Sequence, residues 1–574
     1  MTGPENLLTE WARLVAWSIA ASGVRDVIVS PGSRSTPFVL AMAGRSDLSI
    51  TSVIDERSAA FVALGMARAS GRPAAVLATS GSAPAHWFPA VIEASTANLP
   101  MVLLSADRPL ALAQAGAAQT IDQTKLFGDW VRFFADLGDP RDDVASFEGV
   151  SRTISQAVAS ANGRPAGPVH LNLRADRPLE PIERLNALHA RVDACIARGV
   201  TKFSSAPEGL DEAFAEELAQ ALLRSERPLV ILGPRAPWGR DVSPALSVLG
   251  VSCAAEASSQ LRFGPRGPHV IDAFEHLFSC RSFAAENAPD LILQVGSLPT
   301  PSTYLEVARG VPRFVLDAGG FRDPVGGAVA VSTAAAGPTL DRVASLVGER
   351  ARRPYAADLA RADALAWSEV ERALAGPFGE GAVLRAAMTV LPDEAIVCIG
   401  NSLPIRTLDR FVRGSPRKHA VLAQRGVNGI DGLVAGAVGA GLATRKPVLA
   451  IIGDVSLLHD AGSLLSLRAM KTPLVLVVVD NGGGRIFEEL PIAKRHALED
   501  HMHLFTTPHA VDLGALAVAY GVELAEVRTG AEVSRAVSTG IARSAGTLVR
   551  AIVAPHEASE SLAALRRAIA EVLA

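Results

Sequence analysis

Residues 448–484 read VLAIIGDVSLLHDAGSLLSLRAMKTPLVLVVVDNGGG. Two apolar runs, 448–452 and 474–479, predict buried strands, and the stretch between them predicts a helix. Such a unit predicts two parallel strands whose carboxyl ends lie at the same edge of a sheet. Asp454 follows the first strand and Asn481 follows the second, 481 − 454 = 27 positions later. The stretch therefore predicts an α/β fold with two polar side chains at one sheet edge.

These side chains suit a divalent cation. Mg²⁺ prefers oxygen ligands in octahedral geometry and is usually shared with a phosphate. The carboxylate of Asp454, the amide oxygen of Asn481 and a backbone carbonyl can supply such ligands, and glycines 482–484 let a diphosphate approach the backbone. A strand-end acid and a glycine turn also occur without any ligand. The paired spacing favours the metal site.

The rest of the chain repeats the alternation of strands and helices. We expect an α/β protein of three doubly wound parallel-sheet domains, at residues 1–185, 205–350 and 365–574. Residues 179–209 lose their periodicity between prolines and predict a linker. The other expected strands are 27–29, 75–78, 101–104, 169–172, 229–232, 291–295, 314–316, 395–399 and 548–552.

Composition excludes several classes of protein. The 574 residues include 55 basic and 59 acidic side chains, well mixed, with a formal net charge of −4, which argues against nucleic acid as a partner. Four widely spaced cysteines match neither a zinc site nor a secreted disulfide framework. No export signal is visible, and the longest apolar runs fall short of the roughly 20 residues needed for a membrane span. We expect a cytoplasmic protein without membrane insertion.

A second acidic side chain stands near the N-terminus. The strand-like run 50–54 leads into Asp55-Glu56-Arg57, followed by a helical pattern at 61–69. A buried glutamate at this place can shuttle a proton, because desolvation and partners tune its pKa. A solvated acid that opens a helix beside Arg57 is the alternative interpretation.

Together these regions resemble the thiamine-diphosphate enzymes, whose signature is Gly-Asp-Gly followed by Asn at this spacing, with Val455 here in the third position. The resemblance implies pyrimidine-binding, central and diphosphate-binding domains in that order. It implies that Glu56 hydrogen-bonds the aminopyrimidine ring and promotes the imino tautomer that deprotonates the thiazolium carbon. It assigns Mg²⁺, or Mn²⁺, to Asp454, Asn481 and the carbonyl of Gly483. The implied cofactor contacts are Thr79, Ser80, Gly81, Ser402, Ile430, Gly453, Asp454, Val455, Ser456, Asn481, Gly483 and Ile486.

Further motifs narrow the resemblance to one family, the 2-succinyl-5-enolpyruvyl-6-hydroxy-3-cyclohexene-1-carboxylate synthases of menaquinone biosynthesis. The motifs are SPGSRSTP (30–37), TSGSA (79–83), ADRP (106–109), GAAQTIDQ (116–123), GNSLPIR (400–406), QRGVNGIDG (424–432) and GGRIFEELP (483–491). They span nearly the whole chain.

This family resemblance implies a transferase that decarboxylates 2-oxoglutarate and adds the succinyl-semialdehyde carbanion equivalent to isochorismate. Both substrates are dianions, so several arginines are expected to grip carboxylates through paired hydrogen bonds. Gln119 is implied as a second catalytic residue, and Ile430 as the wedge that bends the cofactor. The implied substrate contacts are Ser33, Arg34, Arg108, Gln119, Ser402, Arg406, Arg425, Ile486, Phe487 and Leu490. In the absence of this resemblance, the arginines would be interpreted as members of ion pairs, and the apolar residues as part of the hydrophobic core.

One departure concerns the central domain, where a basic residue is expected after 296–298 but the run reads PTPSTY (299–304). Arg485 also adds a charge beside the metal loop.

An acetohydroxyacid-synthase-like enzyme or simple decarboxylase is an alternative, which the arginines disfavour; a non-catalytic ligand-binding relative is another, which Glu56 disfavours. The resemblance implies a homodimer or homotetramer with sites at the subunit interface.

Overall fold

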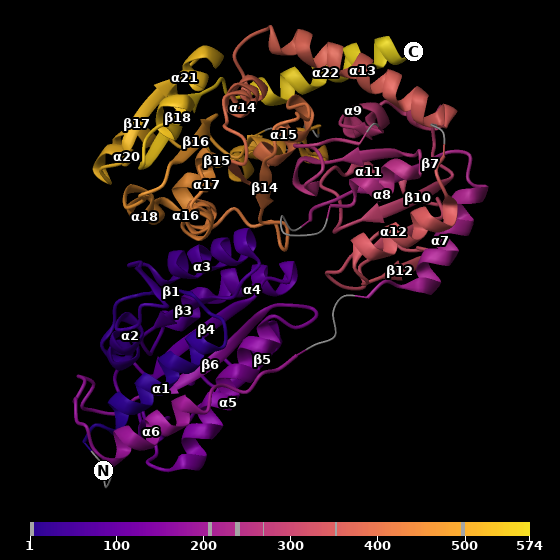
Figure 1. Ribbon diagram of the computed structural model, residues 1–574. Helices are drawn as coiled ribbons and strands as arrows, with labels where there is room; N and C mark the ends of the chain where they lie inside the picture. The colour runs from indigo at the N-terminus through magenta and orange to yellow at the C-terminus, as the bar shows by residue number, and fades with distance from the viewer. Residues whose placement is uncertain (1–4, 205–208, 236–240, 268, 351–352, 495–499) are drawn as a thin grey trace. The chain divides into compact units, whose positions relative to one another are not determined.

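The computed structural model describes residues 5–204, 209–235, 241–267, 269–350, 353–494 and 500–574. It contains three six-stranded sheets whose neighbouring strands run parallel, flanked by helices (Figure 1). The predicted α/β architecture of three parallel sheets is confirmed. The three domain ranges given above stay a prediction.

The first sheet has the strand order β2-β1-β3-β4-β6-β5. Its central strands are buried along their whole length, because helices cover both faces of a parallel sheet. The strands are β1 (Asp26–Val29), β2 (Ser49–Ser52), β3 (Ala74–Ala78), β4 (Met101–Asp107), β5 (Phe133–Asp136) and β6 (Pro168–Arg174). The helices are α1 (Leu7–Ala21), α2 (Thr36–Ala43), α3 (Glu56–Ser70), α4 (Phe88–Ala97), α5 (Val144–Ala161) and α6 (Ala187–Ala197).

The second sheet has the order β12-β11-β10-β7-β8-β9. Numbered within the sheet this is 6-5-4-1-2-3, the doubly wound order found in dinucleotide-binding folds. The strands are β7 (Pro228–Leu232), β8 (Ser252–Ala255), β9 (Val270–Ile271), β10 (Leu291–Val295), β11 (Arg313–Leu316) and β12 (Ala330–Ser332). The helices are α7 (Glu212–Arg224), α8 (Ser243–Val248), α9 (Phe274–Ser279), α10 (Arg281–Glu286), α11 (Thr303–Val307), α12 (Ala336–Val347) and α13 (Pro354–Leu374).

The third sheet has the order β14-β13-β15-β16-β18-β17, which repeats the pattern of the first. The strands are β13 (Ile396–Ile399), β14 (Ala420–Ala423), β15 (Val448–Gly453), β16 (Leu474–Asp480), β17 (Glu523–Val527) and β18 (Gly546–Ile552). The helices are α14 (Glu380–Thr389), α15 (Leu403–Phe411), α16 (Leu433–Thr444), α17 (Asp454–His459), α18 (Leu464–Arg468), α19 (His503–Thr506), α20 (Leu513–Ala519), α21 (Gly530–Ile541) and α22 (Glu557–Leu573).

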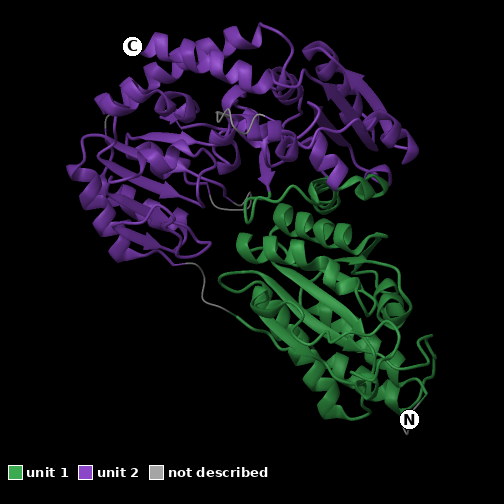
Figure 2. Cartoon of the chain, turned by 180° about the vertical axis from the view of Figure 1, so that it is seen from behind, with its two compact units in different colours: residues 1–205, 424–445, 460–466 green, residues 206–423, 446–459, 467–574 purple. Residues whose placement is uncertain are grey.

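The chain forms two compact units (Figure 2). Unit 1 comprises residues 1–205, 424–445 and 460–466, and unit 2 comprises residues 206–423, 446–459 and 467–574. Among the described helices, none combines the length and the apolar character that a bilayer crossing requires.

The linker prediction for 179–209 is wrong over part of its length. Helix α6 occupies residues 187–197, and its Leu188, Val192 and Cys195 are buried in the core of the first sheet. Its apolar side chains recur at helical spacing, but prolines on either side obscure the pattern.

Within unit 1, helix α3 packs on helix α16 through glycines. A Cβ atom at Gly65 would lie 2.0 Å from the carbonyl oxygen of Gly436, and one at Gly439 would lie 2.0 Å from that of Val62. No side chain fits at such a distance, so these glycines set how closely the two helices approach. The N-terminus of α16 is held by Asp460, whose Oδ2 accepts from two backbone N–H groups at 2.9 and 3.0 Å.

We predict that Gly439→Ala destabilises unit 1 by roughly 1–3 kcal/mol, because the added methyl group meets backbone that must move. The control is Gly149→Ala in α5, where a Cβ meets nothing within 4 Å; it should stabilise by about 0.5–1 kcal/mol. Melting temperatures of the two variants check this, and a Gly439→Ala protein as stable as the wild type would contradict the close packing.

Candidate active site

Asp454 follows strand β15 and has both carboxylate oxygens engaged. Strand β15 pairs with β16 in a register that places Gly453 opposite Val479. Asp454 is 2% exposed; its Oδ1 accepts from the N–H of Val455 at 2.7 Å and its Oδ2 from that of Gly483 at 2.8 Å. Burial raises the pKa of the Asp454 carboxyl above its ordinary value. The structure thus joins this carboxylate to the glycine turn after β16.

Asn481 presents an unused acceptor in the same turn. Its Nδ2 donates to Oε1 of Glu380 at 2.7 Å. Its Oδ1 is buried and has no hydrogen-bond partner among the described residues. Gly483 has a φ of +138°, a conformation that favours glycine. A carboxylate, a bare amide oxygen and the carbonyl of Gly483 fit a hard divalent cation.

Glu380 is a neighbour that the sequence did not reveal, because it stands 101 positions before Asn481. It is 2% exposed at the start of α14, and its backbone N–H donates to Oε2 of Glu557 at 2.9 Å. Burial raises the pKa of the Glu380 carboxyl to about 7. By accepting the amide N–H of Asn481, Glu380 turns the amide oxygen of Asn481 away from itself.

His509 is a second neighbour without a sequence signal, since a lone histidine in a loop predicts no role. Its Nε2 lies 3.2 Å from Oδ2 of Asp454. Three atoms that could bind a metal lie within 4.8 Å of one another, one each from Asp454, Asp480 and His509. Asp480 is already engaged by an ion pair to Arg550 at 2.7 Å. A histidine ring therefore lies against Asp454 in addition to the neighbouring acid Asp480.

Ile486, Phe487 and Leu490 follow the glycine turn, the first two on a single 3₁₀ turn at 485–489. Arg485 folds back on this segment: its Nη1 lies 2.8 Å from Oε1 of Glu488, and its Nε donates to the carbonyl of Asn481 at 3.2 Å. The sequence does not determine where Arg485 points. In the structure its guanidinium contacts its own segment, at Asn481 and Glu488.

Two further predicted residues lie just before and within helix α15. Ser402 precedes the helix with a φ of +71°, and Nη1 of Arg406 donates to its carbonyl oxygen at 2.6 Å. Buried Arg410 donates from Nη1 to Glu489 at 3.0 Å, which ties the 485–489 turn to the same helix. The structure therefore brings α15 together with the turn that bears Ile486 and Phe487.

Two polar groups of the run 299–304 bond within the protein, whereas the buried Oγ1 of Thr300 has no hydrogen-bond partner among the described residues. The N–H of Thr300 donates to Oε2 of Glu256 at 2.7 Å, and the hydroxyl of buried Tyr304 donates to Oε1 of Gln294 at 2.5 Å. These groups hold the end of β10 to its neighbours. No basic side chain stands in the run to meet a carboxylate.

In unit 1, the turn after β3 meets Gln119. Ser80 Oγ donates to the carbonyl of Gln119 at 3.0 Å, and Nε2 of Gln119 donates back to the carbonyl of Ser80 at 3.2 Å. Gly81 has a φ of +89°, and a Cβ there would lie 2.9 Å from Cγ of Gln119. The structure therefore brings Thr79, Ser80, Gly81 and Gln119 together at the carboxyl end of the first sheet.

Two arginines lie at the same sheet edge. The N–H of Arg34 donates to Oγ1 of Thr79 at 3.2 Å, and its Nη1 donates to the carbonyl of Ala175 at 2.8 Å. Burial, and secondly the charge of Arg108, lower the pKa of Arg34. Nε of Arg108 is buried without a hydrogen-bond partner among the described residues. Two mutually repelling guanidinium groups, one with an unused donor, suit an anionic ligand. Ser33, next to Arg34, is exposed.

Glu56 is the first residue of α3 and is half-buried. The helix is capped by Asp55, whose carboxylate accepts from the N–H groups of Arg57 and Ser58 at 2.8 and 3.1 Å. Asp55 therefore satisfies the helix end, and the Glu56 side chain is not needed as a cap.

Arg425 and Ile430 lie on the segment that leads into α16. Glu93, buried in α4, accepts from the N–H groups of Gly426 and Val427 at 3.0 and 2.7 Å and pairs with Arg68 at 2.6 Å. Glu93 was missed by the sequence, because an acid inside a helix predicts a solvated face. It fixes the backbone next to Arg425.

Family models match two parts of this chain. The thiamine pyrophosphate enzyme N-terminal TPP binding domain matches residues 9–126, and the C-terminal TPP binding domain of the same enzymes matches residues 407–551. Thiamine pyrophosphate is thiamine diphosphate, so the matched ranges include Glu56, Asp454 and Asn481. The fold and these matches define a thiamine-diphosphate-dependent enzyme.

Curated relatives are similar over nearly the full length. A 2-succinyl-5-enolpyruvyl-6-hydroxy-3-cyclohexene-1-carboxylate synthase of Sorangium cellulosum is 41% identical, covering 98% of this chain and 95% of that protein. One of the same name from Myxococcus xanthus is 37% identical, covering 94% of each. The chain belongs to the family of these synthases.

Solved structures support the fold. Benzoylformate decarboxylase from Polynucleobacter necessarius superposes with a TM-score of 0.69 at 17% identity, covering 95% of this chain and 98% of that one. A putative thiamin diphosphate-dependent enzyme from Mycobacterium smegmatis gives a TM-score of 0.65 at 20% identity, covering 93% and 97%.

We predict that Asp454→Ala abolishes metal-dependent binding of thiamine diphosphate, because it removes the buried carboxylate of the proposed metal site. Asp480→Asn tests the neighbouring carboxylate, whose ion pair with Arg550 leaves it engaged elsewhere; its metal titration should stay within about threefold of the wild type. Fluorescence titration with Mg²⁺ and cofactor checks both. An unchanged titration in Asp454→Ala would exclude Asp454 as a ligand.

Proposed function

We propose that this enzyme decarboxylates 2-oxoglutarate and adds the remaining succinyl-semialdehyde unit to isochorismate. The product would be 2-succinyl-5-enolpyruvyl-6-hydroxy-3-cyclohexene-1-carboxylate, as the names of the curated relatives indicate. The observation that carries the proposal is the arginine pair Arg34 and Arg108 beside the turn of Thr79–Gly81. Two dianionic substrates need such fixed positive charge, whereas the small products of an acetohydroxyacid synthase do not.

Thiamine diphosphate, when bound, would supply a carbon nucleophile for the 2-oxo group and a thiazolium ring that accepts the electron pair released by decarboxylation. The proposed metal ligands are Asp454, Oδ1 of Asn481 and the carbonyl of Gly483, with Mg²⁺ or Mn²⁺ as the ion. The buried, bare Oδ1 of Asn481 supports this assignment. Gly453, Val455 and Ser456 would lie along the diphosphate, where the N-terminus of a helix favours negative charge.

Glu56 is the proposed proton relay, and Gln119 would assist it from the turn after β3. Ile430 would support the bent cofactor, and Ile486, Phe487 and Leu490 would form the apolar wall of the substrate pocket. The proposed polar substrate contacts are Ser33, Arg34, Arg108, Gln119, Ser402, Arg406 and Arg425. The bond from Arg406 to Ser402 supports a shared role for these two residues.

We also propose a homodimer or homotetramer in which neighbouring subunits complete each cofactor site, in the cytoplasm. The resemblance to thiamine-diphosphate enzymes supports the assembly. Sedimentation of the purified protein at several concentrations tests it, and a monomer with full activity would contradict it.

The direct test is turnover by the purified protein with thiamine diphosphate, Mg²⁺, 2-oxoglutarate and isochorismate. We expect release of CO₂ and consumption of isochorismate that both require the cofactor. Turnover of pyruvate without turnover of 2-oxoglutarate would replace the proposed reaction by that of another carboligase.

We predict that Glu56→Gln keeps the fold and the cofactor affinity but lowers kcat by about 10²–10⁴, because the amide has the same shape and cannot relay a proton. The control is Glu148→Gln on α5, an exposed glutamate that pairs with Arg198. It should turn over like the wild type. Near-normal activity of Glu56→Gln would remove Glu56 from the reaction.

A further inference from the structure

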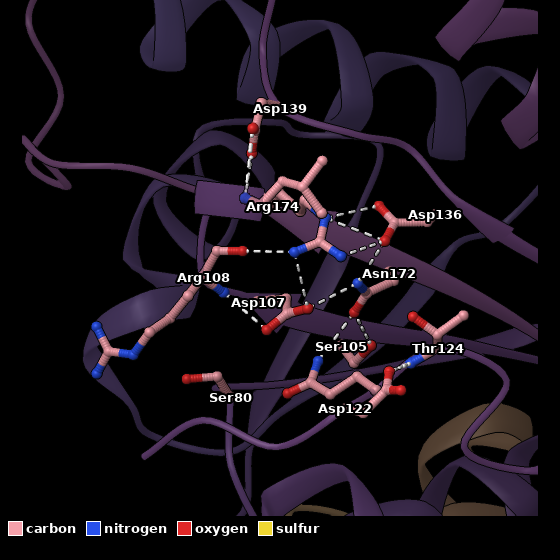
Figure 3. Close-up of polar contacts among 12 residues, drawn as sticks. Ser80, Ser105, Asp107, Arg108, Asp122, Thr124, Asp136, Asp139, Asn172 and Arg174 are labelled. Atoms are coloured by element: carbon pink, nitrogen blue, oxygen red, sulfur yellow. Dashed lines mark hydrogen bonds and ion pairs between the residues drawn. The ribbon is translucent and has the colours of Figure 1, made fainter. Parts of the chain in front are cut away.

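A row of polar side chains crosses the buried part of the first sheet. Ser105 of β4 and Asp136 of β5 both lie opposite Asn172 of β6. Two residues further along the same strands, Asp107 lies opposite Arg174. Side chains two positions apart share one face of a sheet, so these groups meet (Figure 3).

The side-chain amide of Asn172 is the junction of this row. Asn172 is 0% exposed, and its Oδ1 accepts from Nε2 of Gln123 and from Oγ of Ser105, both at 2.9 Å. Its Nδ2 donates to Asp107 at 2.9 Å and to Asp136 at 3.2 Å. All four hydrogen-bonding positions of the amide are used, which fixes its orientation.

One arm of the network leads to the proposed cofactor turn. Oε1 of Gln123 accepts from the backbone N–H of Gly81 at 3.2 Å. Gly81 has a φ of +89°, and a Cβ atom there would lie 2.9 Å from Cγ of Gln119, so the turn packs closely on Gln119. The amide of Asn172, through Gln123, holds the backbone of Gly81.

The other arm leads to the backbone of Arg108. Oδ1 of Asp107 accepts from the N–H of Arg108 at 2.8 Å, and Nη1 of Arg174 donates to the carbonyl of Arg108 at 2.9 Å. Arg174 is held in turn by Asp136, with its Nη2 2.6 Å from Oδ2. The side chain of Arg108 extends away from the network (Figure 3). Its backbone is thus fixed on both sides, while its side chain takes no part in the network.

His170 completes the buried side of the junction. Its Nε2 lies 2.7 Å from Oγ of Ser105, and burial lowers the pKa of His170 to about 3. In the neutral ring, Nε2–H of His170 donates to Oγ of Ser105. The hydroxyl proton of Ser105 is then available for the hydrogen bond to Oδ1 of Asn172. The bare Nδ1 of His170 agrees with this tautomer.

We propose that Asn172 is a positioning residue that holds the backbones of Gly81 and Arg108 in register, so that the cofactor turn and a substrate arginine keep a fixed relation. This role rests on the proposed function, in which Gly81 contacts the cofactor and Arg108 a dicarboxylate. Asn172 itself touches neither ligand.

The two arms can be broken separately. Asn172→Asp keeps the shape and still accepts from Gln123 and Ser105, but it loses both donors and places a third carboxylate beside Asp107 and Asp136. We expect kcat/KM for the dicarboxylate substrates to fall by about tenfold or more, with the thiamine diphosphate affinity within about threefold. Gln123→Met removes the acceptor of the Gly81 N–H. It should weaken thiamine diphosphate binding by about tenfold and leave the Arg108 side of the network in place.

The matched control is Asn6→Asp in the same unit. Asn6 is also 0% exposed, and its Nδ2 donates to the carbonyl of Arg184 at 3.2 Å. It should lower the melting temperature without changing kcat/KM or cofactor affinity. Equal losses of kcat/KM in Asn6→Asp and Asn172→Asp, or kcat/KM within twofold of the wild type in Asn172→Asp, would overturn the positioning role.

Hydrogen exchange separates this proposal from the proposed function. Asn172→Asp should speed amide exchange in residues 106–110, Gln123→Met in residues 80–82, and Asn6→Asp in neither segment. These changes do not depend on which substrate the enzyme uses. Failure of the wild type to consume 2-oxoglutarate would refute the proposed reaction, whereas unchanged exchange in Asn172→Asp would refute the positioning role.

Discussion

A buried carboxylate is stable only when its oxygens are used, and Asp454 meets this condition with backbone N–H groups. One donor is its own neighbour, Val455, and the other is Gly483, which belongs to the next strand connection. The parallel pairing of β15 with β16 is what brings the second donor within reach. That bond holds the glycine turn to Asp454, while Glu380 directs the amide of Asn481 and Arg410 holds the 485–489 turn to helix α15.

The first sheet has the same strand order as the third, and it also has buried polar groups that need hydrogen-bond partners. Its carboxyl edge gathers Thr79, Ser80 and Arg34, while polar side chains below the edge satisfy one another. The first and third sheets therefore hold their candidate site residues at strand ends, the position that parallel sheets offer for ligands. The second sheet has the other strand order, and the Thr300 N–H and the Tyr304 hydroxyl of its 299–304 run bond to the protein itself.

The strand runs and strand-end acids were readable from the sequence, because apolar runs and their spacing act locally. Glu380, Glu93 and His509 were not, because each meets its partner only after distant segments have folded together. Asn172 is an intermediate case. It falls inside the expected strand 169–172, but Ser105 and Asp107 lie beyond the expected strand 101–104, and their contact with Asn172 depends on the register of β4 with β6. Helix α6 was hidden by the prolines around it.

The contact between α3 and α16 has a genetic consequence. Every missense change in the codons of Gly65 and Gly439 encodes a residue with a Cβ atom, the one atom for which the facing carbonyl oxygens leave no space. A library of random variants sorted for folded protein should therefore be depleted of missense changes at these two codons.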